Sequence, residues 1–116
     1  MFYIYGIINI QNNKLYIGKT NDLKRRWREH KYISKGGVEK YGEQYRSIHA
    51  AINKYGIEKF SFFEIIQIED ENDAYFTEAF LIEFCDSKNS GYNEAWGGKG
   101  TLSGINNPMF GKTHTP

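Results

Sequence analysis

The chain has 116 residues and a formal net charge of +1, a length that suits one compact domain with a short appendage. Hydrophobic residues make up 40% of the sequence and aromatic residues 16%, which is enough for a packed core. The single cysteine, Cys85, excludes an internal disulfide and a cysteine-cluster zinc site, and no apolar run is long enough to span a bilayer.

The N-terminal part predicts a β-hairpin followed by a helix. Residues 2–10 are rich in β-branched and aromatic types and predict a strand, and residues 15–18 predict the returning strand. Polar residues at positions 20–22 can cap a helix that runs to about Ser34. Residues 35–43 contain glycines and are expected to form a loop.

The remaining elements complete a small mixed domain. A second helix is predicted over about 45–54, ending before Gly56, and a third strand over 59–68. A third helix over 71–86 has acidic residues in its first turn, where the helix dipole favours them. Residues 87–116 are expected to be a loop or linker. The order predicts an α/β fold with a small three-stranded antiparallel sheet flanked by helices.

Charge is distributed unevenly along the chain. Residues 14–35 contain eight Lys or Arg against two acids, and residues 58–86 contain nine acids against one Lys. The basic part can hold a polyanion and the acidic part a metal ion, or both can be solvated helix faces.

The first helix places two polar side chains on its packing face. Leu23, Arg26, Trp27 and His30 follow a spacing of three and four residues, so Arg26 and His30 lie on or beside the face that packs inward. A guanidinium there needs an anionic partner. That partner is either an acid of the third helix or a phosphate group, to which Arg offers planar, bidentate charge.

The third helix repeats this pattern with a carboxylate. Glu78 lies within an apolar stripe formed by Ala74, Leu81, Ile82 and Cys85. Its charge needs compensation, either by an ion pair with Arg26 or by a metal ion such as Mg²⁺, which often takes only one or two protein carboxylates.

Other candidate residues carry no signal alone. Tyr5 and Tyr16 on the hairpin strands are compatible with ordinary cross-strand packing. His49 and His114 have no metal-ligand spacing with each other.

Five short motifs in order over residues 2–95 resemble the GIY-YIG nuclease family. They are Tyr3-Ile4-Tyr5; Tyr16-Ile17-Gly18; Lys19-Thr20-Asn21-Asp22-Leu23 with Arg26, Trp27 and His30; Ile52-Asn53-Lys54-Tyr55-Gly56 with Phe60; and Glu78 followed by Gly91-Tyr92-Asn93. One departure is that Tyr3 stands where the family has the first glycine. Since that glycine is a backbone position, its loss removes no catalytic group.

The resemblance implies the GIY-YIG fold and a DNA endonuclease that hydrolyses a phosphodiester bond with one Mg²⁺ ion, for which Mn²⁺ can substitute. It implies that Glu78 holds the metal, Arg26 binds the phosphate and Tyr5 takes a proton from the attacking water. Tyr16 and His30 position that water or relay its proton, and Asn93 holds a phosphate or orients Glu78. A tyrosine base predicts activity that rises with pH. Candidate contacts to the DNA backbone are Lys19, Lys24, Arg25 and Arg28.

The predicted domain boundaries are a nuclease domain at 1–95 and a linker at 96–116 that includes the start of a truncated DNA-binding motif. Residues 104–112, GINNPMFGK, resemble the start of a small motif found in the C-terminal regions of phage-type homing endonucleases. The expected partner is double-stranded DNA, with no membrane and no small-molecule cofactor. We expect a monomer that dimerises transiently, in the cytoplasm of a bacterial host or of a cell infected by phage.

Three alternatives use the same features. One is a structure-selective repair nuclease, which would prefer flaps or branches. Another is a restriction enzyme, which would form a tight dimer on a short palindrome. The third is a non-catalytic nucleic-acid-binding module, which would show no metal-dependent nicking.

Overall fold

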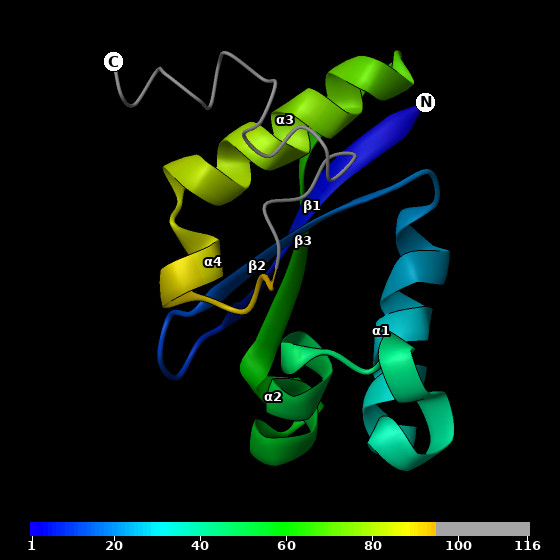
Figure 1. The fold of residues 1–116 in the computed structure, drawn as a ribbon, viewed down its shortest axis with the longest axis vertical. Helices are drawn as coiled ribbons and strands as arrows, with labels where there is room; N and C mark the ends of the chain where they lie inside the picture. The colour runs from blue at the N-terminus through cyan, green and yellow to red at the C-terminus, as the bar shows by residue number, and fades with distance from the viewer. Residues whose placement is uncertain (95–116) are drawn as a thin grey trace.

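The computed structural model describes residues 1–94, which form a three-stranded sheet between two helical layers (Figure 1). The elements in chain order are β1 (Phe2–Asn9), β2 (Leu15–Thr20), α1 (Leu23–Tyr41), the 3₁₀ helix η1 (Gly42–Gln44), α2 (Ser47–Tyr55), the 3₁₀ helix η2 (Ile57–Lys59), β3 (Phe60–Ile68), α3 (Glu71–Phe84) and α4 (Ser87–Ser90). The sheet has three antiparallel strands, as the sequence predicted, and their order is β2-β1-β3. No helix in this described part is both long and apolar enough to cross a membrane.

Alternation along the strands sends apolar side chains to both faces of the sheet. On one face, Tyr5 and Ile7 pack with Ile48 and Ile52 of α2. On the other face, Ile4 and Ile17 pack with residues of α3. Figure 1 shows α1 and α2 on one side of the strands and α3 and α4 on the other. The central strand β1 is therefore buried on both faces, which explains its nearly continuous apolar sequence.

The β1–β2 register places two tyrosines on one face of the sheet. Tyr5 is opposite Gly18, and Ile7 is opposite Tyr16, so Tyr5 and Tyr16 are diagonal neighbours with ring centroids 6.3 Å apart. Tyr3 is an ordinary paired residue opposite Thr20, and β1 begins at Phe2. The missing family glycine therefore leaves the strand intact.

The predicted end of the first helix is wrong. Asp22 caps α1 as expected, since its side chain accepts a hydrogen bond from the Arg25 amide, but the helix extends to Tyr41 rather than to Ser34. Gly37 has a φ of 72° and kinks the helix there. The glycines thus introduce a change of direction rather than the loop expected over 35–43.

The predicted loop after the third helix begins with a short helix. Residues 87–90 form α4, although no helix was expected there. Residues 95–116, with the DNA-binding motif expected at 104–112, lie outside the described residues.

Residues 91–93 cover the outer edge of β2. The Tyr92 amide donates to the Leu15 carbonyl at 2.9 Å, and the side chain of Asn93 bonds both the amide and the carbonyl of Ile17. A Cβ on Gly91 would collide with the Leu15 carbonyl oxygen, so only glycine allows this close approach. The Gly-Tyr-Asn motif therefore satisfies an edge strand that would otherwise expose unpaired backbone groups.

Candidate active site

A pocket of about 220 Å³ opens beside β2, where the two helical layers meet. It is lined by Tyr5, Tyr16, Lys19, Arg26, Arg46, Glu78, Tyr92, Asn93 and Glu94. Five of the six predicted catalytic residues are in this lining, although they come from β1, β2, α1, α3 and the segment after α4. The sixth, His30, is completely buried and bonds the hydroxyl of Tyr5. The sequence did not identify Arg46 or Glu94 as site residues.

Tyr5 is the buried centre of the site. Its ring is fully buried, and its Oη is 2.8 Å from Nε2 of His30. The Nε–H of Arg26 donates to the same oxygen at 3.3 Å. Burial raises the pKa of Tyr5 above its ordinary value and the nearby Tyr16 raises it further, whereas the Arg26 charge opposes the shift. The Tyr5 phenol is therefore neutral unless further positive charge is bound beside it.

Tyr16 lines the same pocket and lies beside the same histidine. Its ring packs edge-on against His30, with centroids 5.5 Å apart. Burial of its hydroxyl raises the Tyr16 pKa, while the charge of Arg26 lowers it. Tyr16 is thus a neutral hydroxyl that can donate to, or accept from, a molecule in the pocket.

Arg26 is oriented by partners on two sides. Its Nη1 donates to Oε1 of Glu29, one helical turn along α1, at 2.9 Å, while its Nε faces Tyr5. Glu29 was expected to be an ordinary solvent residue, but it bridges Arg26 and Arg25. The guanidinium is therefore held in one orientation, which suits it to bind an oxyanion.

A second histidine lies behind the first. Nδ1 of His30 is 2.9 Å from Nε2 of His49 on α2, and His49 is also buried. Nδ1 of His49 accepts a hydrogen bond from the backbone amide of Arg46 at 2.9 Å. Burial and the charge of Arg26 lower the pKa of His30 to about 2 and that of His49 to about 4. Both rings are therefore neutral at physiological pH.

Glu78 brings a carboxylate to the pocket from α3, on the opposite side of the sheet from Arg26. Among residues 1–94 there is no group of three or more His, Cys, Asp or Glu side chains that could hold a metal. The carboxylates that line the pocket are those of Glu78 and Glu94, and Oε2 of Glu94 accepts two hydrogen bonds from Ser47. This ligand set fits Mg²⁺, which keeps most of its waters and binds through one carboxylate and substrate phosphates. It does not fit a structural zinc ion.

Asn93 lines the pocket, but its amide bonds the protein. Its Oδ1 accepts from the Ile17 amide at 2.8 Å and from the Ser87 hydroxyl at 2.7 Å, and its Nδ2 donates to the Ile17 carbonyl at 2.9 Å. The predicted role of Asn93, to hold a phosphate or to orient Glu78, stays a prediction. The three hydrogen bonds fasten the segment after α3 to β2.

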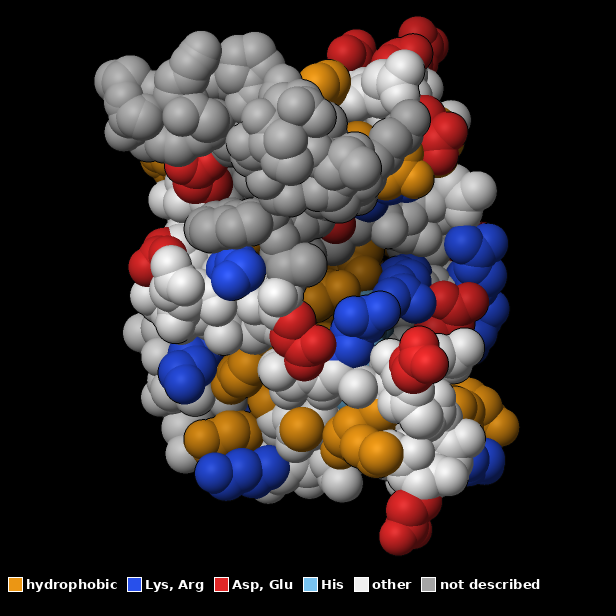
Figure 2. Space-filling model, in the orientation of Figure 1, with side chains coloured by type: hydrophobic (Ala, Val, Ile, Leu, Met, Phe, Trp, Pro, Cys, Tyr) orange, Lys and Arg blue, Asp and Glu red, His pale blue; other side chains and the backbone are white. Residues whose placement is uncertain are grey.

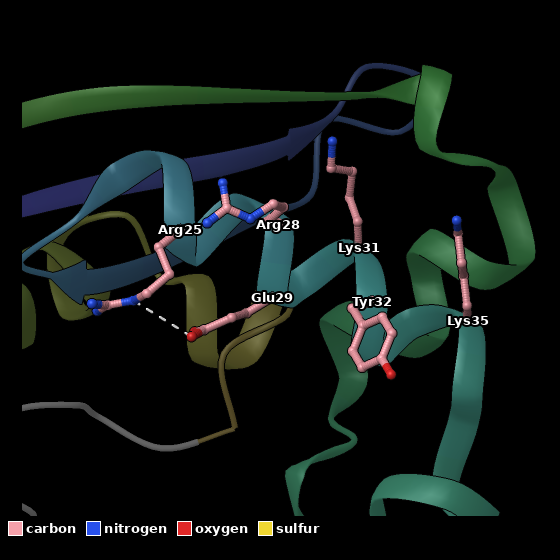
Figure 3. A pocket seen from close by; sticks show the side chains of 6 residues that line it. All are labelled: Arg25, Arg28, Glu29, Lys31, Tyr32 and Lys35. Carbon is pink, nitrogen blue, oxygen red and sulfur yellow. Dashed lines mark ion pairs between the residues drawn. The ribbon is translucent and has the colours of Figure 1, made fainter.

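Basic residues extend from this pocket along α1. A second pocket of about 420 Å³ shares Arg26 and Arg46 with the first. A third, of about 500 Å³, shares Glu29 and Tyr32 with the second. The third pocket is also lined by Arg25, Arg28, Lys31 and Lys35, all on α1 (Figure 3). Figure 2 shows Lys and Arg side chains gathered beside α1 near the middle of the drawn face.

The predicted DNA contacts are placed differently from one another. Arg25 and Arg28 line the pocket of about 500 Å³, while Lys24 is exposed and does not line these three pockets. Lys19 lines the active-site pocket but lies over the rings of Phe2 and Tyr75, 4.9 and 4.3 Å from their centroids. Lys19 is therefore constrained by aromatic contacts.

Comparison with known proteins identifies the family. The model of the GIY-YIG catalytic domain matches residues 1–93, so the chain belongs to this family of catalytic domains. Among solved structures, the catalytic domain of the homing endonuclease I-TevI is 32% identical with a TM-score of 0.69, covering 82% of this chain and 99% of that domain. A glutamate-to-alanine mutant of the same domain is 28% identical with a TM-score of 0.70, covering 82% of this chain and 95% of its own.

Two longer proteins of Enterobacteria phage T4 are similar in sequence. The putative endonuclease segC is 33% identical over 98% of this chain. Intron-associated endonuclease 1 is 32% identical over 79% of it. The chain spans 54% of the length of the former and 36% of the latter.

The contact between Gly18 and Tyr5 yields a first prediction. A Cβ at Gly18 would overlap the ring and hydroxyl of Tyr5, so Gly18→Ala must displace the ring. Because small misplacements of reacting groups cost about 100-fold in rate, we expect DNA nicking to fall by about that factor. Plasmid nicking beside the exposed control Ser61→Ala measures the effect. Parental nicking by Gly18→Ala would show that the Tyr5 position does not matter.

The neutral histidine pair predicts a loss of stability in acid. Both folded pKa values lie below the ordinary value of 6.5, so the unfolded chain binds more protons as pH falls. The stabilisation is complete above about pH 6.5 and is lost toward pH 4 and below, by on the order of 1.4 kcal/mol per pH unit for each histidine.

Urea unfolding at pH 7 and pH 5 measures this loss. His49→Gln, which cannot take up a proton, should show about half of the parental loss between these two values. Equal free energies of unfolding at pH 7 and pH 5 for the parent protein would contradict the assignment of two buried neutral rings.

Proposed function

We propose that this domain hydrolyses a phosphodiester bond of double-stranded DNA with one Mg²⁺ ion, as the nuclease part of a longer homing endonuclease. The observation that carries the proposal is one pocket that gathers Tyr5, Tyr16, Arg26 and Glu78 from four elements. A phosphodiester needs an activated water, charge stabilisation at phosphorus and assistance to the leaving oxygen, and these side chains can supply each function. The two phage endonucleases that match the chain support DNA as the substrate.

Glu78 would hold the Mg²⁺ ion, for which Mn²⁺ can substitute. When bound, the ion supplies positive charge to the scissile phosphate and its leaving oxygen. Arg26 would bind the non-bridging oxygens, because its fork points into the pocket between Glu29 and Tyr5. Arg46 lines the same pocket and can contact a neighbouring phosphate.

Tyr5 would act as the base. The water oxygen forms a bond to phosphorus as the bond from phosphorus to the leaving sugar oxygen breaks. The water proton goes to the Tyr5 phenolate, and the leaving oxygen takes a proton from solvent. Because burial raises the Tyr5 pKa, the phenolate fraction is small at neutral pH and grows with pH, so the rate should rise in the same direction.

DNA would approach along α1. The pockets that share Arg26, Glu29 and Tyr32 form a basic path from the active site toward Lys35, and contacts of this kind hold the phosphate backbone without reading its sequence. We infer a monomeric domain inside the cell, with sequence recognition supplied by other parts of the longer protein.

Removal of the metal ligand or the phosphate clamp should abolish cleavage while sparing the fold. We expect Glu78→Gln and Arg26→Lys to lower plasmid nicking with Mg²⁺ or Mn²⁺ by at least about 100-fold, since the first removes a charge and the second a bidentate fork. Glu83→Gln, on the same helix as Glu78, is the matched control. Undiminished nicking by either active-site variant refutes its assigned role.

The path along α1 predicts salt-dependent binding that depends on Arg28 more than on Lys24. Each lost phosphate contact lowers the slope of log affinity against log salt concentration by about 0.9. We expect Arg28→Ala to show such a change and Lys24→Ala, with the same charge change on the same helix, to show less. Fluorescence anisotropy with labelled duplex DNA from low to moderate salt measures both slopes. Equal slopes in the parent and in Arg28→Ala would exclude this path.

A further inference from the structure

Four groups form a hydrogen-bonded line that leads from the backbone to the active site. The Arg46 amide is 2.9 Å from Nδ1 of His49, Nε2 of His49 is 2.9 Å from Nδ1 of His30, and Nε2 of His30 is 2.8 Å from Oη of Tyr5. Both imidazole rings are completely or almost completely enclosed by protein. Each ring therefore uses both nitrogens within this line.

The direction of every bond follows from its first member. A backbone amide can only donate, so Nδ1 of His49 must accept and carries no hydrogen. A neutral ring has one N–H, which places the hydrogen of His49 on Nε2, where it donates to Nδ1 of His30. His30 must then carry its own hydrogen on Nε2, where it donates to Tyr5. The opposite direction would leave His49 with no hydrogen on either nitrogen.

Protonation of either ring breaks the line. A hydrogen on Nδ1 of His49 would face the Arg46 amide hydrogen, and a hydrogen on Nδ1 of His30 would face the N–H of His49. The charged groups around the pair are Arg26, Arg46 and Glu94, of which the two arginines oppose a further positive charge. The geometry and the surrounding charge thus favour the same neutral forms.

We propose that His49 is a positioning residue for the nuclease reaction, because together with the Arg46 amide it fixes His30 in the tautomer that donates to Oη of Tyr5. This inference rests on the proposed function of Tyr5 as the base. His49 touches neither substrate nor metal and acts through His30.

The consequence for Tyr5 is a defined path for its proton. Its oxygen receives hydrogen bonds from His30 and from Arg26, so the hydroxyl hydrogen points into the pocket. His30 cannot take that proton, because its Nε2 is already occupied. Tyr5 therefore loses its proton into the pocket. The phenolate oxygen still accepts hydrogen bonds from His30 and Arg26, and its remaining lone pair faces the attacking water. His30 orients the base and does not relay the proton.

The tautomers can be measured directly on the DNA-free 116-residue protein. Long-range proton–nitrogen correlation spectra of ¹⁵N-histidine-labelled protein at pH 7.5 distinguish a ring nitrogen that carries hydrogen from one that does not. We expect His30 and His49 both to carry hydrogen on Nε2. A hydrogen on Nδ1 of either ring would overturn the proposal, and this measurement does not depend on nuclease activity.

Two substitutions test the functional consequence through the pH dependence of single-turnover nicking. His49→Leu removes the N–H that donates to His30, so His30 is no longer fixed in the tautomer that donates to Tyr5. Loss of this hydrogen bond to the phenolate should move the rising limb of the pH–rate profile to higher pH by roughly one unit. His49→Gln can place an amide N–H near the ring Nε2 and should keep the limb near its parental position. Asn53→Ala, exposed on the same helix, is the control.

The outcomes separate the two proposals. Nicking by His49→Leu that falls at all pH values without a shift of the limb would overturn the positioning role. If His49→Leu does not fold, the proposal is tested by the tautomers of the parent protein and by the pH–rate profile of His49→Gln, whose rising limb should stay near the parental position. Expected tautomers in a protein that nicks no DNA would support the bond direction and refute the nuclease assignment.

Discussion

The side-chain amide of Asn93 fastens the segment after α3 to the edge of β2 beside the candidate active site. Arg26 and Glu78 come from helices on opposite sides of the sheet, so they can share a pocket only around the edge of β2. Asn93 bonds both backbone groups of Ile17 at that edge and accepts from Ser87, which ties the segment after α3 to the strand that carries Tyr16. Because these groups are buried, their loss would leave several polar atoms without partners, each at a cost of about 1–3 kcal/mol.

Sequence reasoning identified most of the site but not how its parts support each other. Helical spacing placed Arg26 and His30 on a packing face, and the position of Glu78 in an apolar stripe meant that its charge needed compensation. In the structure, Arg26 and Glu78 line one cavity, and His30 bonds Tyr5 of the same cavity. The extent of α1 differed from the prediction, because helical backbone resumes after the non-helical Gly37 and continues to Tyr41. Cys85, expected on the apolar stripe, is exposed and follows α3, which ends at Phe84.

His49 and Arg46 were missed for physical reasons. His49 has no ligand spacing in sequence, and its partner is separated from it by 19 residues and a kinked helix. A signal was present, since His49 lies among the buried residues Ile48, Ala51 and Ile52 of α2, where a polar ring requires hydrogen-bond partners. Arg46 precedes α2, so helical periodicity could not predict which way its side chain points.

The enclosed histidine pair has a further consequence for how the domain responds to its surroundings. Since neither ring takes up a proton under physiological conditions, the pair adds no positive charge to the cavity, whose basic lining residues are Arg26, Arg46 and Lys19. Under the proposed mechanism, the pH dependence of the reaction would then come from ionisation of the Tyr5 phenol and not from the charge of the histidines.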